Sequence, residues 1–170
     1  KANTKWSKDR CKVQLDLYNY SISASRDQDS LKVNSLDLVL TEKCSLKCKN
    51  CSNLMQYYER PIDNDLDVLL KSFDNFLSVV DYCYEVRMIG GEPLMYKNID
   101  KVLEKVLSKK NVGNVIIYTN GTIVPKGDKI NIFKNPKIYF KISNYGEISR
   151  NVEKLEKVLS ENEIHYISER

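Results

Sequence analysis

The sequence predicts an α/β fold in which parallel strands alternate with helices, and three observations support this prediction. Short apolar runs that suit buried strands recur along the chain. Between them lie segments whose apolar residues are spaced three and four positions apart, as on one face of a helix. Polar or glycine-rich residues follow several of the strands directly. This order is typical of βαβ units joined by right-handed crossovers.

The composition indicates one globular domain, because 170 residues can bury a substantial core but are few for two domains. The net charge of +4 comes from lysines spread along the chain, which favours a solvated surface over a nucleic-acid-binding stripe. No apolar run approaches membrane-spanning length, so we expect no membrane partner. Five cysteines, an odd number with three close together, indicate a reducing compartment, and we expect a cytoplasmic protein.

Residues 1–34 are expected to form an N-terminal extension that is largely irregular. Within it, one helix is possible near residues 9–20, and the Ser/Asp-rich stretch 21–30 reads as a loop. Residues 35–170 are expected to form the core. The predicted strands of this core are 36–40, 85–89, 115–118, 138–142 and 164–167.

Helices are predicted between these strands. The first has a clear apolar face from Leu66 to Val80 and an acidic start that includes Asp65. The second spans 99–107, with Asn98 as a possible cap, and Ser149 could cap the last one. Residues 124–135 contain a proline and little periodicity, so their helix should be short or absent.

Four strand ends carry the candidate site. The first strand is followed by Cys44, Cys48 and Cys51, and the second by Gly90-Gly91-Glu92-Pro93. The third ends at Thr119-Asn120-Gly121, and Ser143 follows the fourth. Ligands of parallel sheets gather at the carboxyl ends of the strands, so these residues should lie along one edge.

The spacing Cys-x3-Cys-x2-Cys places three soft thiolates on one loop, which suits an iron–sulfur cluster better than disulfide pairing. A structural zinc site is the alternative, but zinc uses four ligands. The fourth would have to be Cys11, Cys83 or His165, none of which is suitably spaced.

Each of the other site residues has a chemical use and a plain structural one. Gly90 and Gly91 would let a ligand approach the backbone, and the Glu92 carboxylate suits a ligand ammonium group. Asn120 and Ser143 could hydrogen-bond sugar hydroxyls or other neutral polar groups. Taken alone, however, the glycines could simply form a strand-exit turn, and Asn-Gly commonly marks a turn.

The segment Cys44-Ser-Leu-Lys-Cys48-Lys-Asn-Cys51, together with Gly90-Gly91-Glu92-Pro93, resembles the radical S-adenosylmethionine (radical SAM) superfamily. The resemblance covers roughly residues 36–167. It implies a partial (β/α) barrel in which the three cysteines ligate a [4Fe-4S] cluster. It also implies that Gly90 to Pro93 hold the methionine ammonium of S-adenosylmethionine. An electron donor such as flavodoxin or ferredoxin would reduce the cluster. The resulting 5′-deoxyadenosyl radical would abstract hydrogen from an unknown substrate.

Two departures from the family pattern affect these expectations. The family usually has an aromatic residue before the third cysteine, near the adenine, and here that residue is Asn50. Its backbone could still meet adenine, but a stacking contribution is lost. The family barrel has six strands and five are predicted here, so the barrel is expected to be truncated at its C-terminal side. The chain also opens on Lys1, which suggests a fragment.

A second interpretation therefore stays open. The chain could be a non-catalytic iron–sulfur or zinc-binding module, with a structural or partner-binding role in a larger protein. No catalytic side chain can be assigned from the sequence. The substrate could be a peptide, a nucleoside or sugar, or a protein activated by a glycyl radical.

Overall fold

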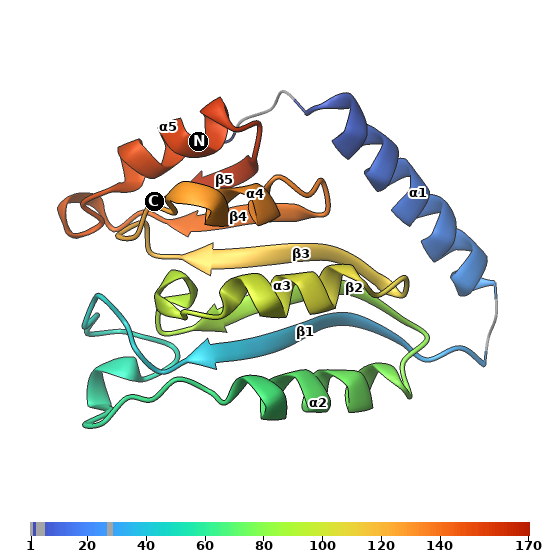
Figure 1. Ribbon diagram of the computed structural model, residues 1–170, viewed down its shortest axis with the longest axis horizontal. Helices are drawn as coiled ribbons and strands as arrows, with labels where there is room; N and C mark the ends of the chain where they lie inside the picture. Colours follow the sequence, from blue (N-terminus) through green and yellow to red (C-terminus); the bar gives the residue numbers. More distant parts are fainter. Residues whose placement is uncertain (1, 3–5, 27–28) are drawn as a thin grey trace.

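The computed structural model describes residue 2, residues 6–26 and residues 29–170 (Figure 1). Its centre is one sheet with the strand order β1-β2-β3-β4-β5, and every neighbouring pair is parallel. These strands are β1 (Lys32–Thr41), β2 (Tyr82–Gly90), β3 (Val112–Thr119), β4 (Ile138–Ser143) and β5 (His165–Glu169). The predicted parallel α/β fold and its five strands are confirmed. Because β1 begins at Lys32, the sheet includes the last residues of the segment expected to be an extension.

The helices follow the predicted order. They are α1 (Lys8–Ser25), α2 (Leu66–Leu77), α3 (Ile99–Leu107), α4 (Ile130–Phe133) and α5 (Val152–Glu161). Helix α4 has only four residues, as the proline-containing segment predicted. The predicted loop over 21–30 is wrong at its start, because α1 continues to Ser25.

Three N-terminal caps were predicted, and the structure shows the N-terminus of each helix concerned: α2, α3 and α5. The Asp65 side chain accepts a hydrogen bond from the Val68 amide and caps α2 as expected. Asn98 precedes α3 without a capping hydrogen bond from its side chain. The cap predicted at Ser149 is wrong, because α5 begins later and the Ser149 hydroxyl accepts from the Tyr145 amide instead.

One face of the sheet carries the hydrophobic core. Side chains alternate between the two faces of a strand, so Val86 and Met88 of β2 point to one face and Glu85 and Arg87 to the other. The core combines this apolar face with residues of α2, α3, α4 and α5, among them Phe73, Leu103, Phe133 and Leu159. The opposite face, here called the inner face, carries many polar side chains.

Helix α1 lies near the amino ends of the strands, away from the predicted site (Figure 1). Its main anchor is Arg10, which is buried and donates to the carbonyls of Pro136 (2.9 Å) and Ile138 (3.1 Å). The Gln14 amide also donates to the Asn114 side chain of β3 at 2.8 Å. Helix α1 therefore covers the end of the inner face at which the strands begin. It does not cover the end at which the strands finish.

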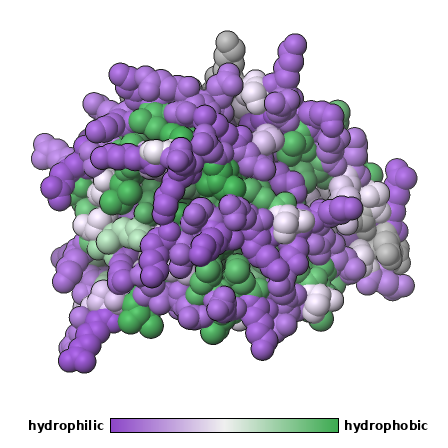
Figure 2. All heavy atoms as spheres, viewed as in Figure 1, coloured by the Kyte–Doolittle hydropathy of each residue, from purple (hydrophilic) through white to green (hydrophobic). Residues whose placement is uncertain are grey.

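The side of the molecule seen in Figure 2 is mostly hydrophilic, with hydrophobic patches between the polar side chains. In the part of the chain that the structure describes, no helix has the length and apolar character needed to cross a membrane.

Candidate functional site

The three clustered cysteines lie on the loop between β1 and α2, and the two ends of this loop are tied together. The Glu42 amide donates to the Ile62 carbonyl (2.9 Å), and the Ile62 amide donates to the Glu42 carboxylate (2.9 Å). The Asn64 amide also donates to the Leu40 carbonyl at 3.0 Å. The cysteine loop is therefore a closed excursion from the carboxyl end of β1.

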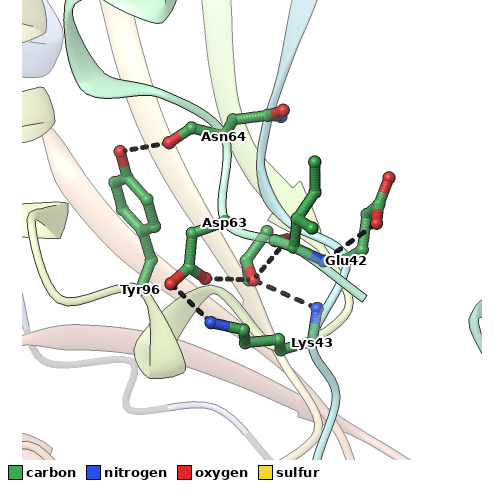
Figure 3. Close-up of polar contacts among 7 residues, drawn as sticks. Glu42, Lys43, Asp63, Asn64 and Tyr96 are labelled. Carbon is green, nitrogen blue, oxygen red and sulfur yellow. Dashed lines mark hydrogen bonds and ion pairs between the residues drawn. The ribbon is translucent and has the colours of Figure 1, made fainter. Parts of the chain in front are cut away.

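Side chains reinforce this closure (Figure 3). The Thr41 hydroxyl donates to Asp63 at 2.7 Å, and the Lys43 ammonium pairs with the same carboxylate at 2.8 Å. Burial opposes ionisation of Asp63, but these two hydrogen bonds outweigh it and lower its pKa from the usual value. The Tyr96 hydroxyl donates to the Asn64 carbonyl at 2.9 Å, which connects the segment after β2 to the same region. The base of the cysteine loop is thus fixed by backbone and side chain together.

Gly90 and Gly91 bring the end of β2 against the residues that lead into Cys44. The Gly91 amide donates to the Thr41 carbonyl and the Glu92 amide to the Lys43 carbonyl, both at 2.8 Å. A Cβ on Gly91 would lie 2.2 Å from the Lys43 oxygen and 2.9 Å from the Cys44 nitrogen. Gly90 has φ +137°, which L-residues with a side chain rarely adopt. Only glycine permits this close approach.

Glu92 is placed differently from the sequence-based expectation. Its side chain is fully buried, and its carboxylate accepts from Leu94 (3.1 Å), Thr119 (2.9 Å) and Asn120 (2.8 Å). Burial raises the pKa of Glu92 to about 7, although these hydrogen bonds act against the shift. The carboxylate joins the ends of β2 and β3, so in this structure it is not presented to a ligand ammonium group. Pro93 follows, buried, at the start of a short 3-10 turn, Pro93–Met95.

Asn120 reaches from the end of β3 to the cysteine loop. Its side-chain amide donates to the Ser45 hydroxyl at 3.1 Å and lies 3.5 Å from the Cys44 sulfur. Its side-chain oxygen accepts from the Thr122 amide at 3.0 Å, and the Ser45 and Thr122 hydroxyls also contact each other. The sequence analysis placed Thr119 at this strand end but gave its hydroxyl no role, and it missed Ser45 and Thr122. Ser45 follows Cys44 directly and Thr122 lies two residues after Asn120, and this proximity in sequence was the available signal.

Cys44, Cys48 and Cys51 are free thiols, and each is partly exposed. Burial raises the pKa of Cys44. Within the described residues, no three thiol, imidazole or carboxylate groups converge closely enough to hold a metal ion. The donor set suits an iron–sulfur cluster in its chemistry, because three accessible thiols share one anchored loop. Loading a cluster requires this loop to draw the three sulfurs together.

The remaining residues singled out from the sequence make no hydrogen bond to Cys44 or to Glu92 among those described above. Asn50 is exposed on the cysteine loop. Ser143 ends β4, where its carbonyl accepts from the Ser149 hydroxyl at 3.4 Å. Cys11 is exposed on α1 and Cys83 is buried in β2, so both lie on other elements than the cysteine loop.

Comparison with known protein families identifies one matching family model, the radical SAM superfamily, over residues 38–157. The chain is 28% identical over 102 residues to the GTP 3′,8-cyclase of Desulforamulus reducens, which covers 57% of this chain and 30% of that protein. It is 22% identical over 152 residues to the probable GTP 3′,8-cyclase of Methanocaldococcus jannaschii, with 79% and 48% covered. The chain therefore spans less than half the length of these relatives.

The fold is similar to solved structures as well. Native anSMEcpe with bound AdoMet and Cp18Cys peptide matches with a TM-score of 0.62 at 18% identity, covering 81% of this chain and 42% of that one. The same protein with bound AdoMet alone matches with a TM-score of 0.63. At this identity the similarity concerns the fold.

Proposed function

This chain belongs to the radical SAM superfamily, and on that premise we propose that it cleaves S-adenosylmethionine to start a radical reaction on a substrate. In this proposal Cys44, Cys48 and Cys51 hold a [4Fe-4S] cluster. Once bound, the cluster supplies the electron that breaks the sulfonium bond of S-adenosylmethionine. The observation that carries the proposal is the meeting of three strand ends at the cysteine loop: Gly91 and Glu92 bond to its base, and Asn120 contacts Cys44.

The chain's own residues would serve this chemistry in distinct ways. The Gly90–Pro93 backbone, pressed against the base of the cysteine loop, offers a surface for the methionine part of S-adenosylmethionine. The Asn50 backbone is the candidate contact for adenine, and Ser143 is a candidate for ribose hydroxyls. Glu92 acts as a positioning residue, because it holds Thr119 and Asn120 in place rather than facing the ligand.

Anaerobic reconstitution tests the proposal. The chain should take up about four irons, as expected for one [4Fe-4S] cluster. With S-adenosylmethionine and dithionite it should then release 5′-deoxyadenosine. Cys48→Ala should abolish both properties. Cys11→Ala is the matched control, because Cys11 is an exposed free thiol on α1, and it should leave both intact.

Two results would contradict this function. One is iron binding that is unchanged in Cys48→Ala, because it would place the metal elsewhere. The other is full cluster assembly without 5′-deoxyadenosine under several reductants and candidate substrates. That second result would favour the non-catalytic metal-binding module.

The substrate and the electron donor are further parts of the proposal. The sequence relatives are named for a reaction of GTP, so GTP is the first substrate to test. The test is consumption of GTP that depends on S-adenosylmethionine and is lost in Cys48→Ala. The donor is proposed to be a flavodoxin or ferredoxin, which would replace dithionite in the same assay.

A further inference from the structure

The three cysteines of the loop differ in their surroundings. In the part of the chain that the structure describes, Cys44 is the one of the three whose sulfur accepts hydrogen bonds. The Leu46 amide donates to this sulfur at 3.4 Å, and the Asn120 side-chain amide donates to it at 3.5 Å. The Leu46 contact is local, whereas Asn120 comes from the end of β3, 76 positions along the chain. The fold therefore brings a hydrogen-bond donor to one particular thiol.

Neighbouring groups fix the orientation of the Asn120 side chain. Its oxygen accepts from the Thr122 amide at 3.0 Å and from the Thr122 hydroxyl at 2.6 Å. The NH2 group is therefore the end that faces the cysteine loop. This group has two N–H donors, so one can meet the Ser45 hydroxyl at 3.1 Å while the other remains for Cys44. The Asn120 backbone is fixed as well, because its amide donates to the buried Glu92 carboxylate at 2.8 Å.

Cys44 is also the cysteine nearest in sequence to the anchored base of the loop. The carbonyl that precedes it accepts a hydrogen bond from the Glu92 amide at 2.8 Å. Gly91 packs so closely that a Cβ there would lie 2.9 Å from the Cys44 nitrogen. The other two cysteines follow four and seven positions later, beyond these contacts. We expect them to move toward Cys44 when the sulfurs are drawn together, while Cys44 stays beside Asn120.

We infer that Asn120 raises the reduction potential of the proposed cluster by donating an N–H to the Cys44 sulfur. Reduction adds one electron, and with it one negative charge that the thiolate ligands share. A hydrogen-bond donor directed at such a sulfur stabilises the reduced form more than the oxidised form. Asn120 is only 9% exposed, and this partial exclusion of water strengthens the electrostatic effect. The inference rests on the proposed function, because it gives Asn120 a tuning role at the cluster that the three cysteines would hold.

A redox titration of the reconstituted protein, without S-adenosylmethionine, tests this role. Dithionite supplies the electron, and electron paramagnetic resonance at low temperature measures the reduced cluster. Asn120→Leu replaces the amide with an apolar side chain of similar size. At a fixed potential the ratio of reduced to oxidised cluster should then fall about tenfold, which equals a shift of about 59 mV for one electron. Asn120→Asp should lower the ratio further, because it replaces the donor with a negatively charged oxygen.

Asn144 offers a matched control. It follows β4 as Asn120 follows β3, and its side-chain oxygen accepts from the Gly146 amide at 2.9 Å. Among the described residues, no hydrogen bond joins its side chain to a cysteine. Asn144→Leu and Asn144→Asp make the same changes of polarity and charge, and they should alter the ratio by less than about twofold, since no hydrogen bond to a sulfur is lost. Iron content should stay the same in all four variants, because tuning does not affect loading.

Failure of this inference can be told apart from failure of the proposed function. Equal potentials in the unchanged chain and both Asn120 variants would overturn the inference alone, and so would an equal shift in the Asn144 variants. Loss of iron uptake in both Asn120 variants would overturn it as well, because Asn120 would then have a structural role. In each of these cases the unchanged chain still takes up iron and releases 5′-deoxyadenosine. An unchanged chain that takes up no iron would overturn both conclusions.

Discussion

At the scale of single residues, Glu92 shows how a buried carboxylate can organise a site without facing it. Its oxygens accept hydrogen bonds from Leu94, from the Thr119 hydroxyl and from the Asn120 amide. Those contacts fix the start of the turn after β3, from which the Asn120 side chain reaches Cys44. Glu92 therefore acts on Cys44 by holding Asn120 in place. In addition to the larger effect of burial, its charge also acts through space to raise the pKa of Cys44.

The pKa of Glu92 makes this role measurable. Burial raises it from 4.5 to about 7, so the folded state binds the proton more tightly than the unfolded state does. The stabilisation from this proton is fully present below about pH 4.5 and is lost as the pH rises to about 7. The free energy of unfolding should therefore fall by roughly 3 kcal/mol across this window relative to Glu92→Gln. Urea unfolding of both iron-free proteins at several pH values checks this. A difference that does not change with pH would contradict it.

Gly91 supports a second prediction at this scale. In Gly91→Ala the new Cβ meets the backbone of Lys43 and Cys44, which cannot move without shifting the cysteine loop. We expect a loss of about 3 kcal/mol in unfolding free energy and much reduced iron uptake. Thermal unfolding and iron content measure the two effects. Gly127→Ala is the control, because nothing lies within 4 Å of its Cβ, although its φ of +63° adds about 1 kcal/mol of strain. Equal iron uptake in the two variants would contradict the proposed close approach.

At the scale of elements, helix α1 is held against the sheet by polar and aromatic contacts, among them those of Arg10, Gln14 and Tyr20. Leu15 and Tyr18 are exposed, so the helix has no continuous apolar stripe to bury. Arg10 compensates, because its guanidinium bonds to two backbone carbonyls and lies 5.0 Å from the Trp6 ring centre and 5.4 Å from that of Tyr139.

Arg10→Met should therefore release α1 from the sheet. It removes two charge-assisted hydrogen bonds at a buried position, and we expect a cost of roughly 2–4 kcal/mol. Amide hydrogen exchange over residues 8–25 should become faster, while exchange in β2 and β3 changes little. Lys12→Met is the matched control, because Lys12 is exposed on the same helix. Unchanged exchange of α1 in Arg10→Met would show that other contacts hold the helix.

The elements also show what the sequence can and cannot predict. The strands and α2 were predicted because their apolar periodicity is local. The end of α1 was not, since a helix without an apolar face gives little periodic signal. The hydrogen bond from Thr41 to Asp63 was not predicted either, because it joins residues that are 22 positions apart in the sequence. The site residues Cys44 and Asn120 were predicted through their place at strand ends, whereas the buried role of Glu92 depends on packing around it.

At the scale of the whole molecule, the sheet separates two environments. One face is covered by α2, α3, α4 and α5 and holds the apolar core. The inner face carries Arg87, Tyr118 and Lys141, and the cysteine loop lies where the carboxyl ends of the strands meet. The two faces of the sheet and the cysteine loop therefore present different surfaces.

The charges of the cysteine loop bear on the electron donor proposed above. Lys47 and Lys49 flank Cys48, and both are exposed. Lys43 lies on the same loop, but its ammonium is already paired with Asp63. If the proposed flavodoxin or ferredoxin docks at this loop, an acidic docking face would associate faster with Lys47 and Lys49, because opposite charges attract.

Reversing these two charges tests the idea. In the double variant Lys47→Glu and Lys49→Glu, release of 5′-deoxyadenosine supported by a reduced flavodoxin should fall about tenfold at low salt, because electrostatic steering is lost. The same reaction supported by dithionite should be unchanged, since a small reductant needs no docking surface. The matched control reverses Lys154 and Lys157, which are exposed on α5. An unchanged rate with flavodoxin would mean that the docking surface lies elsewhere. An equal loss with both reductants would mean that the substitutions damage the cysteine loop itself, and it would contradict the expected difference between the reductants.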